Sequence, residues 1–213
     1  MLIRYVCLSP RKLLWERRDN LNFYISDLHL GHDKALTYDD RPFCTVDEQD
    51  AVIIERWNDR VGDRDNVYIL GDCLWNNNLL FTVIKELKGR KHLILGNHDR
   101  IIASFYDVFT DMNTLIKVKD TGRIVSLCHY PIAHWEGADR GWYHLYGHIH
   151  AGRDSRPFLE YKREMLKRDI PYECYNVGCM LPYMDYTPRT LDEIIEGGKE
   201  WERQQWKSYD NKS

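Results

Sequence analysis

Short apolar runs alternate with longer amphipathic segments along the first half of the chain. The runs at 22–25, 67–70 and 92–95 are rich in aliphatic and aromatic side chains, and a polar residue or a glycine follows each of them. This pattern predicts short buried strands. Between the runs, apolar positions three and four residues apart predict helices over 47–61 and 79–87.

In the second half of the chain, the pattern predicts further strands with little helix between them. Two of these strands flank a hairpin signal at Asp120-Thr121-Gly122. These strands are expected at 114–118, 124–128, 142–146 and 172–177. Helix is expected to return only near the end, over about 191–207. Strand–helix units followed by antiparallel strands predict an α/β protein with layered architecture.

The length of 213 residues and a hydrophobic content of 43% are those of a folded protein. No repeat or linker divides residues 21–213, so we expect one domain there. Residues 1–20 precede the regular pattern and are rich in arginine and lysine. They are interpreted as a basic N-terminal extension whose role the sequence does not define.

Charge and cysteine usage exclude several classes of protein. A net charge of -3 gives no global cationic field, which disfavours a nucleic-acid coat protein. The six cysteines form no C-x-x-C pair, so neither a disulfide framework nor a thiolate zinc site is indicated. No apolar stretch approaches the ~18 residues of a membrane span, and no signal-peptide core stands at residues 1–15. We therefore expect a cytoplasmic protein without a membrane partner.

Polar clusters follow the predicted strands at corresponding positions. In open α/β sheets, side chains just beyond the carboxyl ends of adjacent strands converge on one crevice. Five such clusters can therefore form one site, and their candidate residues are Asp27, His29, Asp72, Asn97, His98, Asp99, His129, His148 and His150.

The donor atoms of these clusters suit a metal centre. They are carboxylate and amide oxygens and imidazole nitrogens, which favour manganese, iron, zinc or nickel over copper(I) or calcium. In an extended segment, side chains at i and i+2 share a face, so Asp27 with His29, and His148 with His150, can each clasp an ion.

The ordered motifs DLH, GD, GNHD, H and GHIH resemble those of the calcineurin-like metallophosphoesterases, over about 22–190. The stretches RPF, WN and HYP resemble the compact bacterial and phage branch of that superfamily. The resemblance implies a four-layer αββα sandwich, with two mixed sheets flanked by helices. It also implies a metal-dependent phosphoric ester hydrolase with two divalent ions, for which we expect manganese, with iron, zinc or nickel as alternatives.

The resemblance further implies roles for single residues. Asp27, His29 and His150 would hold one ion, and Asn97, His129 and His148 would hold the other. Asp72 would bridge the two ions. His98 would protonate the departing alkoxide or contact a phosphate oxygen, and Asp99 would orient His98. Substrate contacts are expected from Arg41, Arg100, His32 and His134.

The function expected from these residues is a phosphodiesterase that acts on a small nucleotide-like ester. A phosphomonoesterase remains an alternative within the same chemistry, and a non-catalytic metal-binding scaffold is an alternative of another class. Nucleic acid is a disfavoured substrate because the chain has little room beyond the core for a DNA-binding domain. The natural substrate, the physiological metal and the oligomeric state are not predicted.

Overall fold

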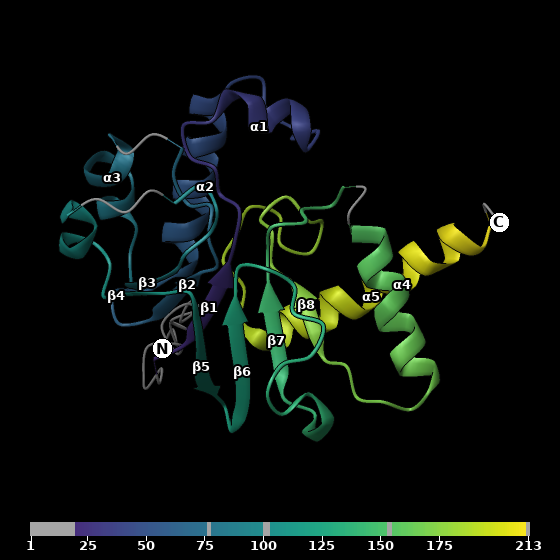
Figure 1. The fold of residues 1–213 in the computed structure, drawn as a ribbon. Helices are drawn as coiled ribbons and strands as arrows, with labels where there is room; N and C mark the ends of the chain where they lie inside the picture. The colour runs from purple at the N-terminus through teal and green to yellow at the C-terminus, as the bar shows by residue number, and fades with distance from the viewer. Residues whose placement is uncertain (1–19, 76–77, 100–102, 153–154, 212–213) are drawn as a thin grey trace, which may run out of the picture.

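The computed structural model describes residues 20–75, 78–99, 103–152 and 155–211, which form two four-stranded sheets with helices beside each (Figure 1). The basic extension predicted at 1–20 lies outside the described residues except for Asn20. The described part is an α/β structure, as expected.

The first sheet has the order β1-β2-β3-β4, with β1 at Asn22–Ile25, β2 at Asn66–Ile69, β3 at Arg90–Ile94 and β4 at Asp111–Asn113. The three strands predicted from apolar runs lie at β1, β2 and β3. All three pairings are parallel, which corrects the expectation of two mixed sheets. A crossover connects each strand of this sheet to the next, and such connections return the chain in the same direction.

Helical segments fill these crossovers and gather beside β1 to β4 (Figure 1). They are α1 (Asp33–Tyr38), α2 (Val46–Arg60), α3 (Leu79–Thr82), and the 3-10 helices η2 (Ile84–Glu86) and η3 (Ala103–Asp107).

Local signals explain how these helices begin and pack. The hydroxyl of Thr45 accepts the backbone N–H of Glu48 at 3.1 Å and caps α2, which lies within one residue of the helix predicted at 47–61. The helix expected over 79–87 is instead α3 followed by η2, although Ile84 and Leu87 are buried as its spacing requires.

The second sheet has the order β5-β6-β7-β8, with β5 at Leu115–Asp120, β6 at Arg123–Cys128, β7 at Tyr143–Tyr146 and β8 at Cys174–Asn176. The β5–β6 pair is the predicted hairpin and is antiparallel, whereas β6–β7 and β7–β8 are parallel. This sheet is therefore mixed, as expected.

Helices α4 (Ser155–Lys167) and α5 (Leu191–Asp210) lie beside the second sheet (Figure 1). The short η4 (Ala138–Arg140) precedes β7. A capping box between Thr190 and Glu193 starts α5 at the expected residue. The expectation that no helix precedes residue 191 in this half is wrong, because α4 was not predicted.

The two sheets meet where β1 ends. The backbone N–H of Ser26 donates to the carbonyl of Val177 at 2.9 Å, and Cys179 donates to the carbonyl of Ser26 at 2.9 Å. One hydrophobic cluster contains buried residues from both sheets and from α2 and α5. The strand ends of both sheets are thus brought to one place. Among the described residues, no helix has the length and apolar character needed to cross a membrane.

Candidate metal centre

The segments that follow the strands are held together by backbone hydrogen bonds. After β1 and β2 the chain runs in parallel, with Asp27 donating to the carbonyl of Gly71 at 3.0 Å and His29 donating to that of Asp72 at 2.9 Å. After β6 and β7, Gly147 donates to the carbonyl of His129 at 2.9 Å. These contacts bring strand ends from both sheets to one place.

Five of the predicted site residues form two groups that could hold metal ions, and the two groups share Asp27. In the first group, the Nε2 of His150 lies 3.4 Å from Asp27 Oδ1 and 3.4 Å from the Nε2 of His29. The second group joins Asp27 to Asp72 and His129. Asp27 and Asp72 are both buried, so each carboxylate faces its neighbours rather than bulk water.

Asp72 lies between the histidines of the two groups. Its Oδ2 atom is 3.8 Å from His29 Nε2 and 3.6 Å from His129 Nε2. Its other oxygen, Oδ1, accepts the backbone N–H of His98 at 2.9 Å. One carboxylate oxygen of Asp72 is therefore fixed by the protein, while the other faces both histidines.

The two remaining predicted ligands lie next to the second group. The Oδ1 atom of Asn97 is 3.0 Å from His129 Nε2. The ring of His148 is exposed, with its centroid 5.0 Å from that of His129, and its backbone N–H donates to both carboxylate oxygens of Asp27 at 3.2 Å. Asn97 thus lies near the candidate ligand atoms, and His148 lies at their outer edge.

The hydrogen bonds of His129 test whether a cation fits this place. Its Nδ1 donates to the carbonyl of Leu70 at 2.7 Å, and in the tautomer that is protonated only there Nε2 carries a lone pair. That lone pair faces Oδ2 of Asp72 and Oδ1 of Asn97, which are also acceptors. Acceptors from three residues facing one another are the donor set that a divalent ion requires, so the residues fit such an ion.

Asp39, the C-cap residue of α1, is a part of the site that the sequence analysis missed. Its buried side chain accepts a hydrogen bond from Nδ1 of His150 and directs the Nε2 of that ring toward Asp27. A carboxylate behind a histidine fixes the tautomer of a metal ligand. Asp39 does not follow a strand, so the pattern that found the other residues does not reach it.

Burial and charge shift the pKa values of these groups in different directions. Burial would raise the pKa of Asp27, but the hydrogen bond and the charge of His150 outweigh it and hold that pKa below its usual range. Burial lowers the pKa of His29 to about 3, which keeps its ring neutral. Burial opposes protonation of His150, yet hydrogen bonds to Asp27 and Asp39 raise its pKa to about 10.

Asp99 has a different role from the one expected. Its carboxylate accepts the backbone N–H groups of Asp72 at 2.9 Å, Gly96 at 2.8 Å and Cys73 at 3.0 Å. Asp99 therefore ties the loop after β2 to the loop after β3. Among the described residues, no hydrogen bond joins Asp99 to the ring of His98, so the structure does not show the expected orienting contact.

His98 lies at the mouth of the centre. The residue is exposed, and the centroid of its ring lies 5.7 Å from that of His29 and 5.1 Å from that of Trp75. Its backbone is fixed through Asp72, while its ring is open to a molecule entering from solvent.

Arg41 was predicted to contact substrate, and the structure contradicts this. Its guanidinium is buried, and all five N–H groups are used. They donate to the carbonyls of Asp27 and Leu28, to the side chain of Gln49 and to the carboxylate of Asp39. Arg41 positions the Asp27 segment and Asp39, and it has no donor left for a phosphate group.

The other three residues predicted to contact substrate differ in where they lie relative to the centre. His32 is buried close to the centre, with its ring centroid 5.5 Å from that of His29. His134 is exposed between β6 and β7 and belongs to neither metal group. Arg100 lies outside the described residues.

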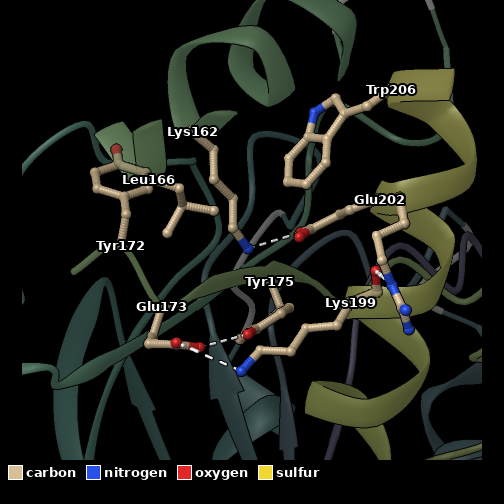
Figure 2. A pocket seen from close by; sticks show the side chains of 9 residues that line it. Lys162, Leu166, Tyr172, Glu173, Tyr175, Lys199, Glu202 and Trp206 are labelled. Carbon is tan, nitrogen blue, oxygen red and sulfur yellow. Dashed lines mark hydrogen bonds and ion pairs between the residues drawn. The ribbon is translucent and has the colours of Figure 1, made fainter. Parts of the chain in front are cut away.

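A separate cavity of about 340 Å³ lies between α4, α5 and β8 (Figure 2). Lys162 projects into it from α4 and donates to the carboxylate of Glu202 at 2.8 Å and to the carbonyl of Cys174 at 2.7 Å. Figure 2 shows this ion pair between the two helices. None of the described residues that line the cavity is a candidate metal ligand, so the cavity is not part of the centre.

No protein-family model matches the chain. The uncharacterized protein MJ1445 of Methanocaldococcus jannaschii is 29% identical over 184 residues, which cover 83% of this chain and 92% of that protein. The gene 66 protein of Mycobacterium phage D29 is 30% identical over 158 residues, which cover 61% of this chain and 78% of that protein. A protein of unknown function from Aquifex aeolicus, AQ665, has a similar fold, with a TM-score of 0.64 at 23% identity over 84% of this chain and 99% of that one.

Fold and site together define an α/β protein in which strand ends from two sheets present a carboxylate–histidine cluster that could hold metal ions. Its identity and coverage with the phage D29 protein place the chain in a family. The chain belongs to the family of the mycobacteriophage gene 66 protein.

Proposed function

We propose that this protein is a dinuclear-metal-dependent phosphoesterase of the calcineurin-like superfamily, acting as a phosphodiesterase on a small nucleotide-like ester. The position of Asp72 carries the proposal. Its buried Oδ2 lies 3.8 Å from the Nε2 of His29 and 3.6 Å from that of His129, so it faces one histidine of each group of candidate ligands. A carboxylate between two groups of imidazoles suits two neighbouring divalent ions better than one.

The arrangement of sheets and helices supports the same proposal. Helices lie beside both sheets (Figure 1), and backbone hydrogen bonds join the segments that follow the strands and carry the motifs. A four-layer αββα sandwich of the metallophosphoesterase type has this arrangement. The ordered motifs DLH, GD, GNHD and GHIH fall at the crevice.

Each residue of the centre would have a distinct role in hydrolysis. Asp27, His29 and His150 would hold one ion, Asn97, His129 and His148 the other, and Asp72 both. The ions would polarise the phosphoryl group and stabilise the charge of the transition state. The exposed ring of His98 would give a proton to the alkoxide oxygen as its bond to phosphorus breaks. Asp39 would hold His150 in the tautomer whose Nε2 faces the centre.

The proposal is tested with manganese-reconstituted wild type and Asp72→Asn, assayed on bis-p-nitrophenyl phosphate and p-nitrophenyl phosphate. Wild type should cleave the diester faster than the monoester. Asp72→Asn should lose at least about a hundredfold in kcat/KM, because losing a bridging ligand removes several kcal/mol of transition-state stabilisation. Asp139→Asn, at an exposed carboxylate in η4, is the matched control and should retain wild-type activity.

Each alternative has its own result in this assay. Faster cleavage of the monoester would indicate a phosphomonoesterase. Manganese-loaded wild type that cleaves neither ester would reject the enzyme and favour a non-catalytic metal-binding scaffold. Equal activity of wild type and Asp72→Asn would show that Asp72 does not serve the reaction.

A further inference from the structure

Two half-exposed aromatic side chains contact the rings of the candidate metal centre. Trp75, just beyond Asp72 in the chain, is 49% exposed, and its ring lies 5.1 Å from that of His98. Tyr130, directly after His129, is 43% exposed and lies 4.6 Å from the ring of His148. Single exposed aromatic side chains are common on proteins, but two of them beside the side chains of the candidate centre offer a surface on which a flat ligand could stack.

The indole of Trp75 is held as a rigid plate. The ring of His32 is parallel to it within 5°, with the ring centroids 3.7 Å apart, and His32 itself is buried. The backbone N–H of Trp75 donates to the carbonyl of Leu30 at 3.0 Å. Because both the backbone and one face of the ring are fixed, little conformational entropy remains to be lost when a ligand binds.

Among the described residues, no second ring lies parallel to the indole of Trp75. A parallel partner can cover only one face of a ring, and His32 has that place on Trp75. His98 meets the indole at a tilt of 53°, so it does not cover the second face in the way that His32 covers the first. Trp75 is half-exposed, so part of its side chain is accessible to a ligand beside the proposed general acid.

We propose that Trp75, backed by His32, is the specificity-determining residue that stacks the base of a mononucleotide-sized phosphodiester at the metal centre. This inference rests on the proposed phosphoesterase function and deepens it. Stacking on an aromatic plate accepts any planar heteroaromatic ring, so it selects nucleosides as a class.

Charge favours a small nucleotide over a polynucleotide. A nucleic-acid strand needs a row of cationic side chains for its phosphates, and the chain has a net charge of -3. Arg41, the arginine buried at the centre, has no N–H group left for a phosphate. A single phosphate between metal ions, with its base on Trp75, requires no such row.

The test compares two substrates that differ only in the base: the methyl ester of adenosine 5′-monophosphate and the methyl ester of ribose 5-phosphate. For manganese-loaded wild type we expect a higher kcat/KM with the adenosine ester. Trp75→Ala should reduce this preference by about five- to a hundredfold, mainly through KM, as expected for one base stacked on an aromatic ring. Trp75→Phe, which keeps a flat ring, should retain most of it.

Tyr161→Ala is the matched control. Tyr161 is 41% exposed on α4, where its ring contacts Tyr172. The substitution therefore removes a similar aromatic surface outside the centre. The preference for the adenosine ester should be unchanged in this variant. If Trp75→Ala loses activity equally on both esters, or if the preference persists, the stacking role of Trp75 is overturned.

A binding measurement separates this inference from the proposed function. Calorimetry of adenosine 5′-monophosphate and ribose 5-phosphate with the manganese-loaded proteins needs no turnover. If wild type cleaves neither ester but binds the adenosine compound more tightly, and Trp75→Ala loses that difference, the proposed function fails and the stacking site stands. If wild type binds both compounds equally, the stacking site is rejected whether or not the protein is an enzyme.

Discussion

The backbone of the centre is strained at the residues whose side chains form it. Asp and His adopt the left-handed conformation more readily than most residues, but each still costs roughly 1–2 kcal/mol there. Such strain persists where the surrounding structure enforces it, and it is typical of functional sites. The residues with positive φ at the centre are Asp27 (56°), His29 (50°), Asp72 (51°), His148 (69°) and His150 (46°).

Gly147 allows the closest approach at the centre. A Cβ atom at this position would lie 2.0 Å from Oγ of Ser26 and 2.5 Å from Oδ2 of Asp27, and both of these side chains are buried. Gly147→Ala should therefore displace Asp27, lowering the free energy of unfolding by about 1–3 kcal/mol. The affinity for manganese should fall as well. Urea denaturation and calorimetric titration of manganese measure the two effects.

Gly152 provides the matched control for this substitution. It lies five residues further along the same segment, and a Cβ atom there would have no neighbour within 4 Å among the described residues. Gly152→Ala should change stability by less than about 0.5 kcal/mol. Equal stability and equal manganese affinity of the two variants would show that the loop after β7 does not need close packing against Asp27.

At the residue scale, the chemical type of a side chain was predictable and its partners were not. A polar residue after a buried strand marked Asp27, Asp72 and His129 correctly as members of one crevice. Arg41 and Asp99 were also expected at the site, but their roles depend on which backbone groups the fold brings to them. Those partners come from other segments, and no local pattern shows them.

At the scale of elements, the apolar runs predicted β1 to β3 because parallel strands are buried on both faces and need continuous apolar side chains. Helix α4 was missed for a related reason. Lys162 occupies the middle of its buried stripe, and the sequence cannot show that Glu202 of α5 neutralises it. Pro157, which suggests a break, lies in the first turn, where its missing N–H has no cost.

Strand β7 contains a buried histidine that makes stability depend on pH. The Nδ1 of His144 lies 3.1 Å from the carbonyl of Ser126, and its Nε2 accepts the N–H of Ile132 at 3.1 Å, so both ring nitrogens serve the neutral form. Burial lowers the pKa of His144 to about 4. Between that value and the ordinary value of about 6.5, the unfolded chain binds a proton that the folded protein does not.

The sign of the effect follows from this difference. The contribution of His144 is complete above about pH 6.5 and is lost as the pH falls toward 4, by up to about 1.4 kcal/mol per pH unit. The free energy of unfolding of wild type should therefore decline more steeply over this interval than that of His144→Gln. Urea denaturation at several pH values measures both slopes, with His134→Gln, at an exposed position, as the control. Identical slopes for wild type and His144→Gln would contradict the account.

At the scale of the whole molecule, the centre exists because two sheets end in the same place. The hydrogen bonds of Ser26 to Val177 and Cys179 join β1 to the segment after β8, and this junction brings His148 and His150 to Asp27. The sequence predicted the convergence of strand ends but not the sharing of Asp27 by both groups. Whether one carboxylate belongs to both groups depends on how the two sheets are placed relative to each other, and no local sequence pattern predicts that placement.

The most direct test of this account is anomalous diffraction from crystals of the full chain grown with manganese. We predict two manganese peaks that both contact Asp72, one beside Asp27, His29 and His150 and the other beside Asn97 and His129. Such peaks would establish the metal centre from which the proposed function and the stacking site are argued. Manganese bound only at other residues, or no peak in this crevice at a saturating concentration of manganese, would contradict the account.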